Sequence, residues 1–328
     1  MSKGRKFRQL LAENDYVYTT GVYNALDASI AEKVGLKCVY MSGYSTSLAI
    51  LARADLGFPT MTEMVTVAEQ IASATSLPVI ADADDGYGNA LITMRTVEKF
   101  EKTGVAGIHI EDQRAPKRCG HIAGKHILPL EEAVGKYRAA LAARQDPDFV
   151  IIARTDARGA VGGSMDEAIL RGKTYANLGV DLVWCEFGST DAVDEFEKFA
   201  LAVRAERPDL PLAFNYSSSQ KWGSSQSRVT FKDLGQMGYK FIFITLGAAH
   251  AAMYSVWNFM QDLQETEHNA QWRLEELTEG HPTESHHVMG DFERFRRLED
   301  EYLPADFVDD RYRSSDGHGR EALQIAAD

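Results

Sequence analysis

The sequence is poor in cysteine. Its 328 residues include only three cysteines, Cys38, Cys119 and Cys185, and no CxxC spacing. An odd number of cysteines without that spacing excludes a disulfide framework and the common zinc sites. Reduced thiols are typical of cytoplasmic proteins, so we expect a cytoplasmic location.

Long apolar runs and excess positive charge are also missing. No run approaches the roughly 20 apolar residues that cross a bilayer, and the basic, amphipathic start MSKGRKFRQLLAEND has no signal-peptide core. The formal net charge is -13. Because phosphate binding needs a basic surface, nucleic acid is excluded as a partner. We expect neither a membrane nor a nucleic-acid partner.

What is present is a regular alternation of short apolar runs with helical patterns. Strands are predicted at 17–21, 38–43, 78–84, 107–112, 149–154, 182–186, 211–215 and 241–245. Helices are predicted at 25–34, 62–74, 92–102, 132–143 and 192–205, from near 249, and after Ser164, which forms a capping-box pattern with Glu167. Eight such units predict an α/β fold, a (β/α)8 TIM-type barrel. A doubly wound sheet is the alternative, but no early GxGxxG motif supports it.

The pattern changes after about residue 265. Residues 264–279 and 291–302 look helical, 281–287 looks like a loop, and the last twenty residues are charged and expected to be mobile. We therefore predict a catalytic barrel over 1–265 and a C-terminal helical extension and tail over 266–328. Such an extension either covers one end of the barrel or packs on a neighbouring subunit.

Polar residues follow nearly every predicted strand. Active sites of barrels lie at the carboxyl ends of the strands, so these side chains are expected to meet at one mouth. They are Tyr40, Ser42, Gly43, Asp82, Asp84, His109, Glu111, Arg154, Trp184, Glu186, Asn215, Ser217, Ser219 and Thr245.

The acids of this set predict a metal site. Asp82 and Asp84 share one strand face, and Glu111 and perhaps Asp55 add further carboxylates. Like charges this close need a cation between them, and hard oxygen ligands suit Mg2+ or Mn2+. The alternative is that Asp84 or Asp85 caps the following helix.

The loop after the fourth strand contains Lys117, Arg118, Cys119, Gly120 and His121. This electropositive setting should lower the pKa of the Cys119 thiol and favour the thiolate. The alternative is a basic surface loop that happens to hold a cysteine.

Two further groups could bind an anionic substrate. Arg118 and Arg154, with His121, offer cationic donors for carboxylates, although Arg154 could instead form a structural salt bridge with Asp156. The alternating Asn215, Ser217 and Ser219 offer neutral donors, or form a hydroxyl-rich turn. Trp184 and Phe214 would be apolar walls or core.

Longer motifs carry a resemblance over nearly the whole barrel. They are DADDGYG (82–88), HIEDQ (109–113), KRCGH (117–121), ARTDA (153–157), WCE (184–186), NYSSS (215–219) with Trp222, and MGYKFIFITL (237–246). The sequence resembles a short form of isocitrate lyase, in the isocitrate lyase and phosphoenolpyruvate mutase superfamily. KRCGH points to the lyase branches.

The resemblance implies a Mg2+-dependent retro-aldol cleavage of isocitrate to glyoxylate and succinate, as in the glyoxylate bypass, by a homotetramer. Cys119 would protonate the succinate carbon, and Tyr40 or Glu186 would take the hydroxyl proton. Gly120 and Gly124 would let the cysteine loop close. The implied catalytic residues are Cys119, His121, Tyr40 and Glu186. The implied substrate-binding residues are Ser42, Gly43, Tyr44, Arg118, Gly120, Arg154, Trp184, Asn215, Ser217, Ser219 and Thr245. The implied metal ligands are Asp82, Asp84, Glu111 and Asp55.

Three alternatives stay open. One is 2-methylisocitrate lyase, which yields pyruvate and succinate. Another is a carbon–phosphorus mutase or oxaloacetate hydrolase on the same barrel, against which Cys119 argues. The third is a catalytically inactive barrel that serves as a binding protein, although none of the implied site residues is missing.

Overall fold

The computed structural model describes residues 1–313 and shows a closed barrel of eight parallel strands in chain order. The strands are β1 (Val17–Val22), β2 (Val39–Met41), β3 (Val79–Asp82), β4 (Gly107–Glu111), β5 (Val150–Thr155), β6 (Leu182–Cys185), β7 (Leu212–Asn215) and β8 (Tyr239–Ile244). β8 pairs with β1, with Val17 opposite Phe241 and Thr20 opposite Ile244. This closure confirms the predicted (β/α)8 barrel and rules out the doubly wound sheet, which has two unpaired edges.

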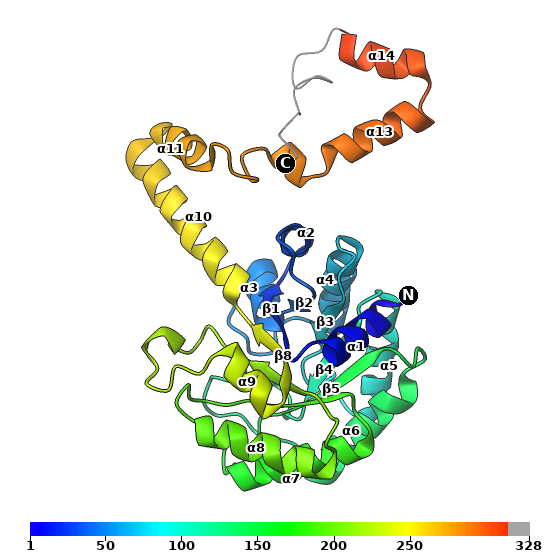
Figure 1. Cartoon of the computed structure of the whole chain (residues 1–328), viewed down its shortest axis with the longest axis vertical. Helices are drawn as coiled ribbons and strands as arrows, with labels where there is room; N and C mark the ends of the chain where they lie inside the picture. The colour runs from blue at the N-terminus through cyan, green and yellow to red at the C-terminus, as the bar shows by residue number, and fades with distance from the viewer. Residues whose placement is uncertain (314–328) are drawn as a thin grey trace. The chain divides into compact units, whose positions relative to one another are not determined.

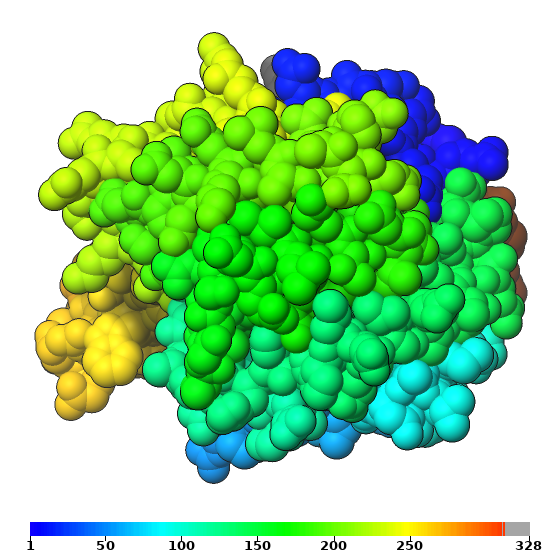
Figure 2. Space-filling view, turned by 90° about the horizontal axis from the view of Figure 1, so that it is seen from below, coloured from blue at the N-terminus to red at the C-terminus, as the bar shows by residue number. Residues whose placement is uncertain are grey.

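Helices surround the strands (Figure 1). Those of the barrel are α1 (Lys3–Glu13), α2 (Ala25–Lys33), α3 (Gly43–Leu51), α4 (Met61–Ser73), α5 (Ala90–Lys102), α6 (Leu130–Ala143), α7 (Met165–Leu178), α8 (Val193–Glu206) and α9 (Phe231–Met237), with the 3-10 turn η1 (Trp222–Ser224). Figure 2 shows the outer surface of this layer, with residues around α7 and α8 in green towards the viewer.

Strand side chains alternate between two apolar layers. On β5, Ile151 and Ala153 pack outwards against the helices, whereas Val150 and Ile152 fill the barrel interior. A parallel sheet that is buried on both faces requires such continuous apolar strands. The polar residues that follow each strand are therefore left at the carboxyl end of the barrel.

Helix α1 packs against the opposite end of the barrel. Phe7 is fully buried and meets the ring of Phe241 edge-on at 5.1 Å. Lys240, on β8, donates to the carbonyls of Leu11 (2.9 Å) and Asn14 (3.1 Å) at the end of this helix. Helix α1 thus packs over the bottom of the barrel interior.

Three barrel helices, α1, α3 and α9, were not predicted. α3 follows β2 at once, because Ser42 caps it by accepting a hydrogen bond from Ser45 N at 3.1 Å. α9 begins with a complete capping box between Thr230 and Asp233. The predicted cap of α7 is half formed, since Ser164 accepts from Glu167 N while the Glu167 side chain binds Arg171 at 2.7 Å.

The chain divides into two compact units, Met1–Ala252 and the residues from Met253 on. The second unit comprises most of α10 (Gly247–Thr266), then α11 (Asn269–Thr278), α12 (His286–Met289), α13 (Phe292–Tyr302) and α14 (Ala305–Arg313). α12 lies where the loop at 281–287 was predicted to end. Residues 314–328, most of the segment that we expected to be mobile, lie outside the described residues. Among residues 1–313, none of the helices has the length and apolar character of a membrane span.

Candidate active site

A small cavity of about 20 Å³ lies at the carboxyl ends of the strands. Residues at the end of, or after, seven of the eight strands line it, all but β1, and most of the predicted site residues are among them. The lining consists of Tyr40, Tyr44, Asp55, Asp82, Cys119, Gly120, His121, Arg154, Trp184, Glu186, Asn215, Ser217, Ser219, Thr245 and Leu246. Five predicted site residues do not line it: Ser42, Gly43, Asp84, Glu111 and Arg118.

Four rings form a buried layer beneath this cavity. Tyr40 stacks on Phe243 with ring centroids 4.2 Å apart, and Trp184 meets His109 and Phe243 edge-on. The Tyr40 hydroxyl hydrogen-bonds His109 Nε2 at 2.8 Å. Burial, and next the Asp82 carboxylate, raise the pKa of Tyr40 well above its ordinary value. Tyr40 therefore holds its proton at neutral pH.

Asp82 is fixed from three directions at the end of β3. Its carboxylate accepts hydrogen bonds from the backbone N–H groups of Gly43 (3.1 Å) and Asp84 (2.9 Å). His109 Nε2 lies 3.3 Å from its Oδ1. Burial opposes ionisation, but His109 and Lys117 overcome it and hold the pKa of Asp82 well below its ordinary value. A Cβ at position 43 would collide with this carboxylate. Gly43 therefore makes room for Asp82, although it does not line the cavity.

Lys117 lies among the remaining acids. Its ammonium nitrogen is 2.6 Å from Asp55 Oδ1 and 2.6 Å from Asp84 Oδ1. Burial opposes the charge, but the surrounding carboxylates hold the pKa of Lys117 well above its ordinary value. Burial raises the pKa of Asp84 to about 7, although Lys117 opposes the rise. The alternative role for Asp84 or Asp85 as a helix cap is not realised, because Asn89 caps α5.

Asp82, Asp84 and Glu111 carry the type of oxygen donor that binds a hard divalent cation. Glu111 is almost fully buried, and neither of its oxygens receives a hydrogen bond from the described residues, although Arg154 Nη1 lies 3.1 Å away. Burial raises its pKa well above the ordinary value, against the opposing effect of Arg154. Over residues 1–313 no three acids, histidines or cysteines converge on one point; Lys117 stands between Asp55 and Asp84. The oxygen donors of Asp82, Asp84 and Glu111 are those that Mg2+ prefers.

Cys119 faces the cavity as a neutral thiol. It is 9% exposed, and its backbone N–H donates to Asp55 O at 2.9 Å. Burial, and next the Asp55 carboxylate, raise the pKa of Cys119 to about 11. The predicted lowering of this pKa is therefore wrong. The neighbouring Arg118 side chain is exposed to solvent, so adjacency in sequence does not bring its charge to the thiol.

Arg154 forms the salt bridge with Asp156 that was considered as its structural role. Its guanidinium pairs with Asp156 through Nε (2.9 Å) and Nη2 (3.0 Å). It also lies 3.3 Å from Glu186 and stacks 4.4 Å above the ring of Trp184. Burial opposes the charge, but these carboxylates hold the pKa of Arg154 well above its ordinary value. It is a fixed cation at the cavity wall.

The neutral donors form a cluster that is connected by hydrogen bonds. Asn215 Nδ2 donates to Glu186 at 3.2 Å, and Thr245 Oγ1 donates to Asn215 Oδ1. His121 Nε2 lies 3.6 Å from Glu186 Oε1. Ser217 Oγ accepts from the N–H of Ser219 at 3.1 Å, so these two residues form a turn as well as part of the lining.

Three residues of the site were not predicted from the sequence: Leu246, Asp156 and Lys125. Leu246 lines the cavity directly after Thr245, and its place after a strand end was an available signal. Asp156 and Lys125 support the site from behind, with Lys125 Nζ 3.4 Å from Asp156 Oδ1. Asp156 was considered only as a partner that would make Arg154 structural, and nothing in the sequence pairs it with Lys125.

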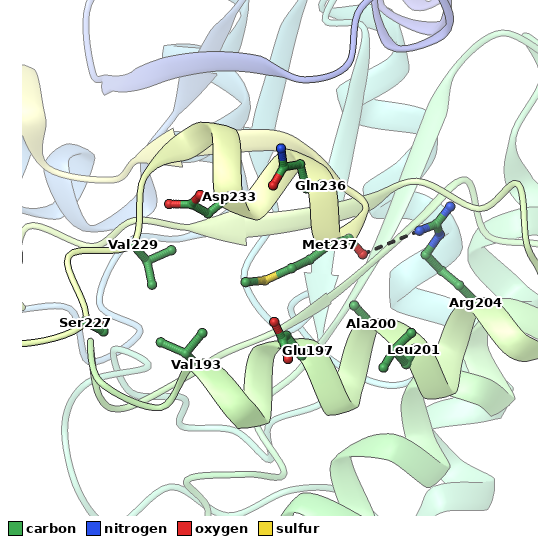
Figure 3. A pocket seen from close by; sticks show the side chains of 10 residues that line it. All are labelled: Val193, Glu197, Ala200, Leu201, Arg204, Ser227, Val229, Asp233, Gln236 and Met237. Carbon is green, nitrogen blue, oxygen red and sulfur yellow. Dashed lines mark hydrogen bonds between the residues drawn. The ribbon is translucent and has the colours of Figure 1, made fainter.

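A larger hollow of about 570 Å³ lies elsewhere, between α8 and α9 (Figure 3). Its charged lining residues are Glu197, Arg204 and Asp233, and Arg204 Nη1 donates to Met237 O at 3.5 Å. Both helices belong to the outer layer, so this hollow is separate from the strand ends. The small cavity therefore remains the candidate active site.

A closed parallel barrel with acids, a fixed guanidinium and a protonated thiol around one cavity at the strand ends has the architecture of a (β/α)8-barrel enzyme. The chain belongs to the phosphoenolpyruvate mutase and isocitrate lyase superfamily. The family model described as phosphoenolpyruvate phosphomutase matches residues 7–264, almost the whole barrel unit. The resemblance seen in the motifs is thereby confirmed.

Several characterised relatives are similar over most of their length. An isocitrate lyase of Haloferax volcanii is 46% identical over 92% of this chain and 87% of its own. A 2,3-dimethylmalate lyase of Eubacterium barkeri is 47% identical over 66% of this chain and 75% of its own. A 2-methylisocitrate lyase of Shewanella oneidensis is 36% identical over 81% and 87%. A phosphonopyruvate hydrolase structure with oxalate and Mg2+ is 28% identical, covers 93% of this chain and 100% of its own, and has a TM-score of 0.77.

Proposed function

We propose that the protein is a Mg2+-dependent isocitrate lyase, which cleaves isocitrate to glyoxylate and succinate in the glyoxylate bypass. The observation that carries this proposal is the Cys119 thiol, which stays protonated and lines the same cavity as Arg154 and Asn215. A carbon–carbon lyase that releases a carbanion-like product needs an acid of this kind beside donors for carboxylates. The 46% identity to the Haloferax volcanii isocitrate lyase supports the choice of substrate.

The residues that would bind the substrate carboxylates surround the cavity. Arg154 offers a guanidinium fork, and Asn215, Ser217, Ser219 and Thr245 offer neutral donors. Trp184 and Leu246 supply the apolar wall. Because Arg154 is already paired with Glu111 and Glu186, a substrate carboxylate would exchange with one of these acids.

Of the two candidate bases for the substrate hydroxyl, the geometry supports Glu186. Tyr40 keeps its proton, since burial raises its pKa well above the ordinary value, and its hydroxyl is bonded to His109. Glu186 is held by Asn215 and Arg154 at the cavity wall. Mg2+, held by Asp82, Asp84 and Glu111, would lower the pKa of the bound hydroxyl and offset the charge of the substrate.

Two proton transfers, one to Glu186 and one from Cys119, complete the proposed reaction. Glu186 accepts the hydroxyl proton, the electron pair of the O–H bond forms the carbonyl of glyoxylate, and the pair of the broken carbon–carbon bond passes into the succinate fragment. Cys119 then donates its proton to the succinate carbon and becomes a thiolate. Return of the proton from Glu186 to Cys119 through solvent restores the starting state. His121, 3.6 Å from Glu186, and the Asn215 cluster would stabilise the developing charge.

Substrate entry would require the Cys119 loop to open. A cavity of about 20 Å³ has room for roughly one water molecule, far less than a tricarboxylate needs. The loop after β4 covers the cavity with Cys119, Gly120 and His121. Movement of this loop would admit the substrate and then exclude water from the reaction.

A second candidate is 2-methylisocitrate lyase, which the identity to the Shewanella oneidensis enzyme favours. The test is to supply purified protein with Mg2+ and either isocitrate, 2-methylisocitrate or 2,3-dimethylmalate, and to follow glyoxylate, pyruvate or propionate. We expect the highest kcat/KM with isocitrate. Higher kcat/KM with a methylated substrate would replace the proposed substrate, and no turnover of any of the three would contradict lyase function.

A further inference from the structure

Two buried lysines hold the cysteine loop, one on each side of the segment Cys119–His121. Lys117 precedes it and pairs with Asp55 and Asp84. Lys125 follows it and donates from Nζ to the carbonyl oxygen of Gly120. Lys117 has partners among the acids proposed to hold Mg2+, so its contacts would change when a cation binds. The partners of Lys125 are not among those acids.

Lys125 is built into the wall of the site. Its side chain is 4% exposed, and its ammonium lies 3.4 Å from Asp156 Oδ1. Its own carbonyl accepts a hydrogen bond from Val161 N at 2.8 Å, which ties it to the loop after β5. Lys125 thus joins the loop after β4 to the loop after β5. Its contact with the first loop is at Gly120, between Cys119 and His121.

Asp156 connects Lys125 to Arg154, the arginine that is proposed to bind the substrate. Its carboxylate is fully buried and binds Arg154 through two hydrogen bonds of 2.9 and 3.0 Å. Its backbone N–H donates to Asp112 Oδ1 at 3.0 Å. Asp112 in turn accepts from the hydroxyl of Tyr175 at 2.8 Å and from Arg171 at 3.2 Å. This buried network fixes Asp156 from the outer layer of helices.

We propose that Lys125 and Asp156 are positioning residues: the Lys125 ammonium holds the Gly120 carbonyl against Asp156, so that the Cys119 peptide and the Arg154 guanidinium keep one relative geometry. Neither residue lines the cavity. They act through the loop that carries the acid and through the arginine that binds the anion. The part that concerns catalysis rests on the proposed lyase function; the part that concerns the loop does not.

The test compares Lys125→Met with Lys240→Met. Lys240 also bonds backbone carbonyls, of Leu11 and Asn14, but at the opposite end of the barrel. Lys125→Met should fold, because Asp156 stays paired with Arg154. We expect it to raise the rate at which iodoacetamide alkylates Cys119 by about tenfold and to lower kcat about 100-fold, with KM changed less than about threefold. Lys240→Met should lower only the thermal midpoint.

Two further variants keep the test decisive. Lys125→Arg retains a cationic donor and should restore kcat to within about tenfold of the wild type. Gly159→Ala displaces Lys125 gently, since the added Cβ would lie 3.2 Å from Nζ, and should give an intermediate increase in alkylation even if Lys125→Met does not fold. Wild-type alkylation rates in both Lys125→Met and Gly159→Ala, or in Gly159→Ala alone if Lys125→Met is unfolded, would overturn the proposal. Faster alkylation in a protein whose wild type cleaves none of the substrates would overturn the proposed function only.

Discussion

The pKa of the Cys119 thiol is raised, whereas its neighbours in the sequence indicate that it should be lowered. The motif KRCGH places two cations beside it, yet burial and the Asp55 carboxylate dominate its pKa. A neutral thiol is the form that an acid needs, because it has a proton to give. The same reasoning makes Cys119 a poor nucleophile at neutral pH.

The rate at which Cys119 is alkylated should depend strongly on pH. Since only the thiolate is alkylated and the pKa of Cys119 is raised to about 11, the rate should increase about 100-fold between pH 7.5 and 9.5 without a plateau. Mass spectrometry of peptides after timed iodoacetamide treatment measures it. Cys38 and Cys185, which are fully buried, should stay unmodified. An increase of only about tenfold, with the rate levelling off towards pH 9.5, would show that the thiol ionises normally.

Replacement of Cys119 by serine tests its role as the acid. Cys119→Ser removes the thiol but keeps a small polar side chain, so turnover should fall about 100- to 10,000-fold. Succinate affinity, measured by calorimetry, should change by less than about threefold. Turnover near that of the wild type would exclude Cys119 as the proton donor.

At the scale of elements, the strand ends of β3 and β4 concentrate buried carboxyl groups. Asp82, Asp84 and Glu111 are buried here, and the basic side chains that contact them among the described residues are His109, Lys117 and Arg154. Bringing an anionic substrate to this edge requires further positive charge.

We therefore expect EDTA to abolish turnover and Mg2+ or Mn2+ to restore it. Direct binding of Mg2+, followed by calorimetry, should weaken at least about tenfold in Asp82→Asn, because a hard cation loses an anionic oxygen ligand. Thermal melting of the variant serves as the folding control. Full activity in excess chelator would contradict the proposed metal site.

Helix α1 gives a stability prediction. Phe7 is fully buried against Phe241, so Phe7→Ala should lower the free energy of unfolding by about 3–5 kcal/mol. Arg5→Ala, on the same helix, removes an exposed salt bridge with Asp148 and should cost less than about 1 kcal/mol. Urea unfolding followed by circular dichroism compares them. Equal losses would mean that α1 does not depend on its buried face.

The elements also show what a single sequence can predict. The eight strands were predictable because a doubly buried parallel sheet demands continuous apolar runs. α3 was missed because its residues, Gly43–Leu51, are mostly small and hydroxylated and show no apolar stripe. The pairing of Lys125 with Asp156 could not be predicted, since it joins two loops whose approach depends on the closed barrel.

At the scale of the whole molecule, α10 exposes a row of large apolar side chains. Tyr254 and Trp257 are 71% and 72% exposed, and Met260 is 62% exposed. Large apolar side chains gathered on one helix are characteristic of interaction surfaces. This is compatible with the expected packing of the C-terminal extension on a neighbouring subunit.

We expect light scattering after size exclusion to give a mass four times the 36.4 kDa of the chain. Trp257→Asp places a charge on this row and should reduce the mass to that of a dimer or monomer. Leu201→Asp, which alters an exposed residue of α8, is the matched control and should leave the mass unchanged. A monomeric wild type would contradict the expected tetramer.

The closure of the barrel by β1 and β8 has a consequence for the newborn chain. Val17–Val22 leaves the ribosome early, but its partner Tyr239–Ile244 is made more than 200 residues later. At roughly 5–20 residues per second, β1 waits about 10 to 40 s with one edge unpaired. An unpaired strand edge is a template for association with other chains. Biosynthesis should therefore depend on chaperones that shield this edge until β8 emerges.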